Sequence, residues 1–328
     1  MSSPFLSGLR LCERAFETPD GICMKPYLIV NPAAARGTMA KRWSAIQEIL
    51  RAENFAFDSA FTERRGHATE LARAALAAGC DLIVAVGGDG TLNEVVNGMF
   101  AEDGKAVNPN ARLGVISSGT GSDFVRTANL PRDPALAARH LARANSSCTL
   151  DIGEMVFRVN DKETRRHFVN VAGMGFDAEV IERTERGGKR GGGTIPYYSA
   201  LIATVFNYQN KAVTLRVDDQ TLEGNVNSVV VCNGKFFGGG MMVGPHAALD
   251  DGKFDVVVIG DFGKVEVILN TPRLYNGTIL THPKVNEYRG TTVTVASEQR
   301  MLIEADGELI GEGPATFRLL PAALKLQI

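Results

Sequence analysis

The sequence lacks the features that mark membrane-spanning and nucleic-acid-binding proteins. None of its apolar runs reaches the roughly 18 residues that a membrane-spanning helix requires. The 328 residues carry a net charge of only −2, and no long block of like charges interrupts them. A broad surface for nucleic acid needs an excess of Lys and Arg, so we expect no nucleic-acid partner.

Cysteine is also scarce, with five residues in the chain. The number is odd, no two form a C-x-x-C pair, and three lie in or beside apolar runs. This pattern predicts buried, reduced thiols and a reducing compartment such as the cytoplasm. The cysteines are Cys12, Cys23, Cys80, Cys148 and Cys232.

What the sequence does contain is a change near residue 147 in the pattern of its predicted helices and strands. Before it, short apolar runs alternate with amphipathic patterns, which predicts a parallel sheet with helices on both faces. After it, many short strand-like runs are bounded by Gly, Asp or Asn, which predicts an antiparallel β-rich domain. Residues 1–23 have no such pattern, and we expect them to be disordered, with the folded chain beginning near Met24. The predicted strands are 27–31, 56–62, 81–88 and 112–119, and the predicted helices are 41–54, 67–79, 91–100, 133–143 and 195–208.

A glycine-rich turn, GGDGTLNEVVNG at 87–98, follows the apolar run that ends at Val86. The first amides of a helix have no partner within the helix, and the helix dipole makes that end electropositive. Glycines let an anion approach these amides closely, so the turn predicts a phosphate cradle. Asp89 would repel phosphate unless a cation lay between them, which fits Mg²⁺ on a nucleotide triphosphate. The alternative is a tight turn in which Asp89 only caps the helix.

Two similar loops favour phosphate binding. NPAAARGT at 31–38 follows the first predicted strand, and SSGTGSDF at 117–124 follows the fourth. Thr62 ends the second strand. Because parallel strands deliver their carboxyl ends to one sheet edge, these segments are expected to meet there.

Four motifs in this order resemble the catalytic domain of the diacylglycerol kinase family, in its bacterial soluble branch. That domain is shared with sphingosine and ceramide kinases and is related to NAD kinase. The motifs are GGDGTLNEVVNG, SGTGSDF at 118–124, GGGMMVGPHAALDDGKFDVVV at 238–258 and ADGE at 305–308. The resemblance implies a three-layer α/β nucleotide-binding domain over 24–147, a β-sandwich lipid-binding domain over 148–315, and an active-site cleft between them. It also implies that residues 316–328 form a strand that returns to the first domain.

The resemblance implies ATP as the phosphate donor, and it assigns residues to ATP one by one. Ala35 stands where the family usually has glycine, and Gly37 could supply the missing flexibility. Ser122 replaces the Asn of the family's Asn-Asp pair and keeps a hydrogen-bonding group. The implied ATP-binding residues are Asn31, Pro32, Ala33, Ala34, Ala35, Thr62, Gly87, Gly88, Asp89, Gly90, Thr91, Leu92, Asn93 and Thr120.

A structural Mg²⁺ is implied at Asp251, with the carbonyl groups of Ala248 and Lys253. One carboxylate together with carbonyls and waters suits this hard cation. The alternative is that Asp-Asp-Gly simply makes a hairpin turn.

The ADGE motif carries the expected proton chemistry. A lipid hydroxyl is a weak nucleophile, and a carboxylate within hydrogen-bond reach can take its proton during attack on the γ-phosphate. We favour Glu308 as the proton acceptor, with Asp306 holding the metal or orienting the network. The alternative is again a hairpin turn.

The acceptor is expected to be a lipid at a membrane surface. The apolar stretch 195–208 lies beside the basic segment 182–193, a combination that suits an anionic membrane, although a core helix after a solvated loop fits equally well. Diacylglycerol is the first choice, with a sphingoid base or ceramide next. NAD kinase activity, an inactive nucleotide or lipid sensor, and a homodimer remain open.

Overall fold

The computed structural model describes residues 15–17, 23–119, 121–160, 162–186 and 194–328. The chain divides into two compact units. The first comprises Met1–Leu150 together with Ala323–Ile328, and the second is Asp151–Ala322. Two strands, β7 (Ser147–Val159) and β20 (Ala315–Gln327), contribute residues to both units.

The first unit is built on a parallel sheet. Its strands have the order β6-β5-β3-β4, and residues 325–326 of β20 pair in parallel with β6. Each residue of β3 and β5 is buried, which explains why both read as continuous apolar runs. The strands are β3 (Pro26–Val30), β4 (Asp58–Phe61), β5 (Leu82–Gly87) and β6 (Arg112–Ser117).

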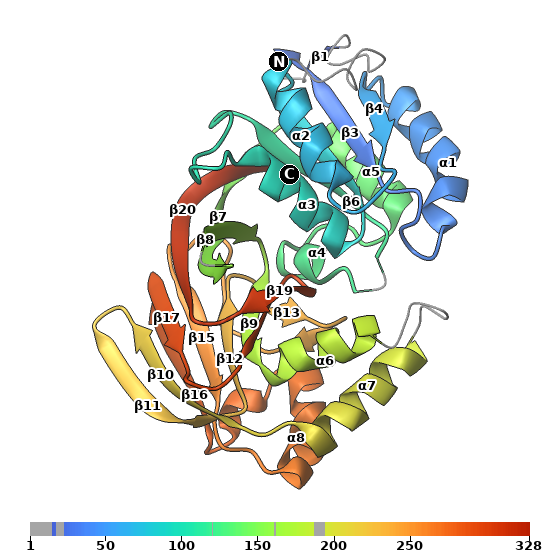
Figure 1. The fold of residues 1–328 in the computed structure, drawn as a ribbon. Coiled ribbons are helices and arrows are strands. Elements are labelled where there is room, and N and C mark those ends of the chain that lie inside the picture. The colour runs from blue at the N-terminus through green and yellow to red at the C-terminus, as the bar shows by residue number, and fades with distance from the viewer. Residues whose placement is uncertain (1–14, 18–22, 120, 161, 187–193) are drawn as a thin grey trace. The chain divides into compact units, whose positions relative to one another are not determined.

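Helices cover both faces of this sheet (Figure 1). The helices α1 (Thr38–Ala52) and α5 (Pro134–Arg143) pack on one face, where Trp43 and Leu141 join one apolar cluster with the strands. The helices α2 (His67–Ala77) and α3 (Asp89–Met99) pack against each other on the other face. The short helix α4 (Asp123–Thr127) follows the loop after β6.

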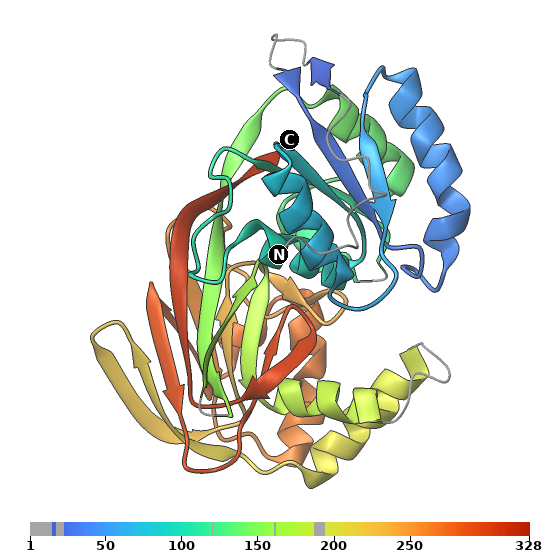
Figure 2. The ribbon, with the colours of Figure 1, turned by 45° about the horizontal axis from the view of Figure 1, so that its top comes forward.

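The second unit is an antiparallel sandwich. One sheet has the order β16-β15-β12-β9-β18-β19, and the other contains β11-β10-β17-β20 with β7 and β8. Side chains from both sheets form one buried apolar cluster that includes Phe168, Phe254 and Phe317. The β10–β11 hairpin forms an edge of its sheet (Figure 2). The strands are β8 (Lys162–Phe168), β9 (Val171–Gly175), β10 (Lys211–Val217), β11 (Gln220–Val226), β12 (Ser228–Cys232), β13 (Phe236–Phe237), β14 (Met241–Met242), β15 (Phe254–Ile259), β16 (Val285–Gly290), β17 (Thr292–Ala296), β18 (Leu302–Ala305) and β19 (Glu308–Glu312).

Three helices belong to the second unit: α6 (Phe176–Arg186), α7 (Thr194–Asn207) and α8 (Lys264–Asn276). The α6 helix contacts β9, β18 and β19, and α7 contacts both α6 and α8. A short 3₁₀ turn, Ile279–Thr281, follows α8. Within the described residues, no helix is both long and apolar enough to cross a membrane.

The predicted fold class, an α/β domain followed by an antiparallel β domain, is confirmed. At the N-terminus, Phe16 and Glu17 (β1) pair with Met24 and Cys23 (β2), so paired structure begins before the expected start at Met24. Most other residues of 1–23, and the basic segment 187–193, lie outside the described part of the chain.

The prediction of reduced thiols is wrong for Cys80. This residue is disulfide-bonded, whereas Cys232 is a buried thiol. Apolar surroundings alone therefore did not identify the state of Cys80, because burial suits a thiol and a disulfide equally.

Candidate active site

Three loops follow strands of the first unit at the carboxyl edge of its sheet. They are residues 31–37 after β3, residues 88–90 around the start of α3, and residues 118–119 and 121–122 after β6. Because β3, β5 and β6 are parallel neighbours, their carboxyl ends bring these loops together.

Glycines allow two of these loops to touch through their backbones. A Cβ on Gly119 would lie 3.1 Å from Gly88 Cα, and a Cβ on Gly88 would lie 3.5 Å from Gly119 Cα. The first distance is tighter than an ordinary carbon contact. A side chain at Gly119 would therefore push against the other loop, whereas a Cβ at Gly88 would make an ordinary contact.

The Asp89 carboxylate ties the same two loops together. Asp89 begins α3, and its Oδ1 accepts the N–H of Asp123 over 3.1 Å and that of Phe124 over 3.5 Å, both at the start of α4. Burial raises the pKa of Asp89, and these backbone N–H groups oppose the rise. Asp89 thus helps to fix the position of the glycine loop relative to the start of α4.

Asn31 connects the first loop to the second. Its Nδ2 donates to Thr91 Oγ1 over 2.9 Å, while its Oδ1 accepts the N–H of Ala33. Gly87 lies against the same threonine, because a Cβ there would be 2.5 Å from Thr91 Oγ1. Ala34 and Pro32 complete the turn that Asn31 begins.

Ala35 adopts the conformation that glycine favours. Its φ is 51°, and the next two residues, Arg36 and Gly37, have φ of 58° and 80°. A left-handed alanine costs roughly 1–2 kcal/mol relative to the right-handed region. At the position where the resemblance leads us to expect glycine, the chain thus has a strained alanine, and Gly37 adds to the turn without removing that strain.

The remaining ATP-binding predictions divide into two groups. Thr62 directly follows β4, where its N–H donates to Val30 O over 2.8 Å, and Gly90 lies in the first turn of α3. Leu92 and Asn93 are instead 2% and 0% exposed, so their side chains belong to the interior of the unit. Thr120 lies outside the described residues.

Sequence reasoning missed the role of Glu94 in this unit. Its carboxylate accepts the N–H of Gly66 over 2.8 Å and that of Ala68 over 3.1 Å, at the start of α2. A carboxylate there complements the helix dipole and otherwise unpaired amides. Glu94 and Gly66 are 28 positions apart, and no local sequence pattern links residues at that separation. No sequence signal could therefore have revealed this contact.

In the second unit, the ADGE motif forms the turn between β18 and β19. Asp306 and Gly307 have φ of 48° and 81°, as in a two-residue hairpin turn. The Asp306 carboxylate accepts three backbone N–H groups over 2.9–3.1 Å, from Val169, Asn170 and Val171. Its oxygens therefore anchor the turn to the segment between β8 and β9.

Glu308 is the first residue of β19, directly after this turn. Its Oε2 lies 3.2 Å from Arg166 Nη2, and its side chain is 18% exposed. Both acids of the motif are half-buried. They differ in their contacts, because Asp306 accepts three backbone N–H groups whereas Glu308 forms an ion pair with an arginine side chain.

The predicted Mg²⁺ site at Asp251 does not fit the geometry. Its Oδ1 accepts the N–H of Lys253 over 3.1 Å, and its Oδ2 pairs with the Arg289 guanidinium. Arg289 also lies 3.1 Å from Asp255 Oδ1. A cation would have to displace this arginine, and the described residues contain no cluster of three or more potential metal-binding side chains around Ala248 or elsewhere. The turn interpretation describes these residues better.

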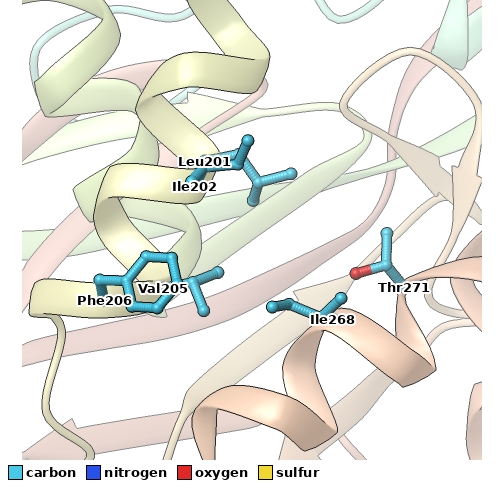
Figure 3. A pocket seen from close by; sticks show the side chains of 6 residues that line it. All are labelled: Leu201, Ile202, Val205, Phe206, Ile268 and Thr271. Atoms are coloured by element: carbon cyan, nitrogen blue, oxygen red, sulfur yellow. The ribbon is translucent and has the colours of Figure 1, made fainter.

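An apolar pocket of about 190 Å³ lies between α7 and α8 (Figure 3). Side chains from the two helices point into it, and several are largely exposed: Ile202 and Phe206 at 58% each and Ile268 at 53%. The pocket is smaller than the roughly 300 Å³ at which small-molecule sites begin. Its lining is Leu201, Ile202, Val205, Phe206, Ile268 and Thr271.

Family models match both parts of the chain. Residues 25–155 match the diacylglycerol kinase catalytic domain, and residues 170–328 match the YegS C-terminal NAD kinase beta sandwich-like domain. A diacylglycerol kinase of Staphylococcus haemolyticus is 31% identical over 293 residues, which is 88% of this chain and 84% of the relative. The chain belongs to the diacylglycerol kinase family.

Two further members of the family match this chain over most of its length, and one of them shows that the fold is shared. The diacylglycerol kinase of Bacillus subtilis is 27% identical over 88% of this chain and 91% of its own. The crystal structure of a putative diacylglycerol kinase from Bacillus anthracis has a TM-score of 0.73 at 27% identity, and it covers 93% of this chain and 96% of its own. Membership in this family makes the protein a kinase.

Proposed function

We propose that this kinase transfers the γ-phosphate of ATP to a lipid hydroxyl, with diacylglycerol as the acceptor and phosphatidic acid as the product. The observation that carries the proposal is the junction of Gly88, Gly119 and Asp89, where two glycine loops touch at the carboxyl edge of a parallel sheet. Backbone amides at such an edge suit phosphate groups.

In this proposal the first unit binds the nucleotide. The loops around Gly88 and Gly119 present backbone N–H groups to the phosphates, and Asn31 holds Thr91 in register with them. Asp89 would face the Mg²⁺ that accompanies ATP, and that ion would neutralise charge on the transferred phosphoryl group. The anchoring of Asp89 by the α4 amides supports a fixed position for this acid.

The second unit supplies the proton acceptor. Glu308 accepts the proton of the lipid hydroxyl as the hydroxyl oxygen attacks the γ-phosphorus. The bond between the γ-phosphorus and the oxygen that bridges it to the β-phosphate breaks, and ADP leaves with that oxygen. Arg166 Nη2 lies 3.2 Å from Glu308 Oε2 and so helps to orient this carboxylate. Asp306 fixes the turn and does not itself accept the proton, because its carboxylate is engaged by three backbone amides.

The surface that approaches the lipid is the pair of helices α7 and α8. Val265 and Leu269 on α8 are 66% and 70% exposed, and they extend the apolar surface that Ile202 and Phe206 begin on α7. Lys264 lies beside them, with its Nζ donating to Phe206 O. Apolar side chains with an adjacent cation suit the interface of an anionic bilayer. The small pocket between the helices suits part of an acyl chain rather than a whole lipid.

The test is transfer of labelled phosphate from ATP with Mg²⁺ to lipids in mixed micelles. The panel contains diacylglycerol, a sphingoid base, ceramide and phosphatidylglycerol, with NAD as the soluble acceptor. We expect labelled phosphatidic acid. Labelled sphingoid base or ceramide would support a lipid kinase but would replace diacylglycerol as its acceptor. Label on NAD would replace the proposal with NAD kinase activity, and ATP binding without any product would favour a sensor.

A pair of variants separates the two acids of the turn. Glu308→Gln is expected to lower kcat by roughly 10²- to 10⁴-fold, as for loss of a general base, with little change in KM for ATP. Glu312→Gln, on the exposed end of the same hairpin, is the matched control and should retain activity. Full activity in Glu308→Gln would contradict its assignment as proton acceptor.

A further inference from the structure

Two carboxyl groups converge on Gly173, in the middle of β9. This glycine is the direct neighbour of Glu304 on β18, and Asp177 lies in the first turn of α6, just after the strand. A Cβ on Gly173 would lie 1.8 Å from Asp177 Oδ2 and 3.1 Å from Glu304 Oε1. The absence of a side chain at Gly173 thus leaves the space in which the two acids meet, within a few ångströms of each other.

Each acid has one oxygen that accepts a hydrogen bond and one that does not. Ser228 Oγ donates to Asp177 Oδ1 over 3.2 Å, and Gly307 N–H donates to Glu304 Oε2 over 3.0 Å. The other oxygens, Asp177 Oδ2 and Glu304 Oε1, are buried and have no hydrogen-bond partner among the described residues. Two ionised carboxylates offer only acceptors, so they cannot pair with each other.

The surroundings of the two acids disfavour a second negative charge. Burial raises the pKa of Asp177 to about 6, and burial together with the charge of Asp177 raises the pKa of Glu304 well above its usual range. Asp306 raises the pKa of Glu304 further. Among the described residues, no cation contributes to either shift. The other titratable groups that sense this pair are Tyr208 at the end of α7 and Cys232 on β12.

We infer that Asp177 and Glu304 share one proton, with Glu304 Oε1–H donating to Asp177 Oδ2, and that this pair positions the turn that carries Glu308. A single proton converts one of the two unpaired oxygens into a donor and so satisfies both. On Glu304 the proton lies on Oε1, because Oε2 of the same carboxyl already accepts the Gly307 N–H. Glu304 holds it in preference to Asp177 because the pKa of Glu304 is raised further.

A metal ion is a poorer occupant of this site. Mg²⁺ requires near-octahedral oxygen coordination and keeps several of its waters. The site offers two carboxylate oxygens, one serine hydroxyl and the backbone of Gly173 in close contact. A proton needs only the two oxygens that already converge.

The pair reaches the catalytic turn through one hydrogen bond. Glu304 holds Gly307 N–H while Asp306 holds the amides of residues 169–171, so the turn is fixed at two adjacent positions. Glu308 follows directly, and its placement therefore depends on Glu304. Glu304 is a positioning residue, and this part of the inference depends on the proposed role of Glu308.

The activity test compares two substitutions of Glu304. In Glu304→Gln, the amide donates to Asp177 Oδ2 while its carbonyl accepts from Gly307, so kcat should remain within about twofold of the wild type. In Glu304→Leu both bonds are lost, and kcat should fall by roughly 10- to 100-fold with KM for ATP nearly unchanged. If Glu304→Gln lost as much activity as Glu304→Leu, the shared proton would be refuted.

Two measurements that need no kinase activity test the proton itself. The difference infrared spectrum between wild type and Glu304→Gln at pH 7 should contain the carbonyl band of a protonated carboxylic acid. Its absence would overturn the inference, as would stabilisation of the wild type by Mg²⁺ alone that Glu304→Gln abolishes. These spectra test the shared proton without any turnover. If the wild type showed the band but no kinase activity, the proposed function would be refuted and the shared proton would stand.

The pH dependence of stability gives a second, independent result. Both acids have pKa values in the folded state above their values in the unfolded chain, so the folded state binds more protons. The stability that they contribute is complete below about pH 4 and is lost as pH rises through about 6 and beyond. Glu304→Gln should flatten this decline in Tm, whereas the control Glu312→Gln should retain it. An unchanged slope in Glu304→Gln would contradict the inference.

Discussion

Asp89 begins a helix in the first unit, whereas Asp306 occupies a hairpin turn in the second. Each is followed by glycine, and each accepts backbone N–H groups from another segment: two in the case of Asp89 and three in the case of Asp306. The glycines serve different purposes. Near Asp89, the absence of a side chain at Gly119 allows its loop to approach Gly88 closely, while Gly307 after Asp306 supplies a positive φ.

The difference teaches that an Asp-Gly motif does not define the task of its aspartate. In the first unit, the loops around Asp89 leave backbone amides at the start of a helix for an anion. In the second unit, Asp306 accepts the N–H groups of residues 169–171, and in the proposed function the next acid, Glu308, accepts the proton. Four substitutions test this contrast.

The largest effect is expected for Asp89→Ala. The change removes the acceptor that ties α4 to the glycine loop. It also removes the charge that faces the cation of the nucleotide in the proposed function. Turnover should fall by about three orders of magnitude or more while the circular dichroism spectrum stays that of a folded protein. Asp103→Ala, at an exposed acid paired with Lys105, is the control and should remain active. Near-normal turnover in Asp89→Ala would remove the phosphate site from the first unit.

Asp306→Asn should act first on stability. One oxygen becomes an NH₂ group that faces backbone donors, so at least one buried amide loses its acceptor, at a cost of roughly 1–3 kcal/mol in the free energy of unfolding. Urea denaturation measures the change, with Glu308→Gln as the comparison, which should be nearly as stable as the wild type. Equal stabilities of the two variants would remove the contrast between an anchoring and a reacting acid.

Gly119→Ala should have a smaller effect, mostly on nucleotide binding. The added Cβ would lie 3.1 Å from Gly88 Cα, so the loops must separate slightly. We expect the KM for ATP to rise by about tenfold, corresponding to roughly 1.4 kcal/mol. Gly224→Ala, with open space around the added carbon, is the control. An unchanged KM would show that the close approach of the loops is not required.

The smallest effect is expected for Ala35→Gly. Removal of the Cβ relieves the left-handed backbone at φ 51°, which should raise the free energy of unfolding by up to about 1 kcal/mol after the entropy of glycine in the unfolded chain is subtracted. Thermal denaturation measures the shift. Ala34→Gly, at a residue without positive φ, should lower stability instead. A loss of stability in both variants would contradict the strain at Ala35.

Much of the fold follows from local patterns. The continuous apolar run at 81–88 predicts β5, observed at Leu82–Gly87, because a strand buried on both faces needs apolar residues throughout. The helix α6 was not predicted. Its residues are mostly polar or charged, and its contacts with β9 and β18 cannot be read from neighbouring positions.

The candidate site divides in the same way. The loops around Gly88 and Gly119 are predictable, because each directly follows an apolar strand and parallel strands end at one edge. The anchoring of Asp306 at Val169 and the meeting of Asp177 with Glu304 are not, because these partners are more than a hundred positions apart. Arg289 pairs with Asp251 where the sequence suggests a metal, and at 38 positions away it also cannot be identified from the neighbouring residues.

The strand β20 has a consequence for the order in which the chain can fold. Arg112 of β6 donates to Gln327, which lies 215 positions later in the chain, and the parallel pairing of residues 325–326 covers that edge of the first sheet. During synthesis the first unit therefore emerges with β6 as an exposed edge, which is a site for unwanted pairing with other chains. Its sheet is complete only after the whole second unit has been made. We thus expect the first half of the nascent chain to need a chaperone until β20 has been synthesised and has paired with β6.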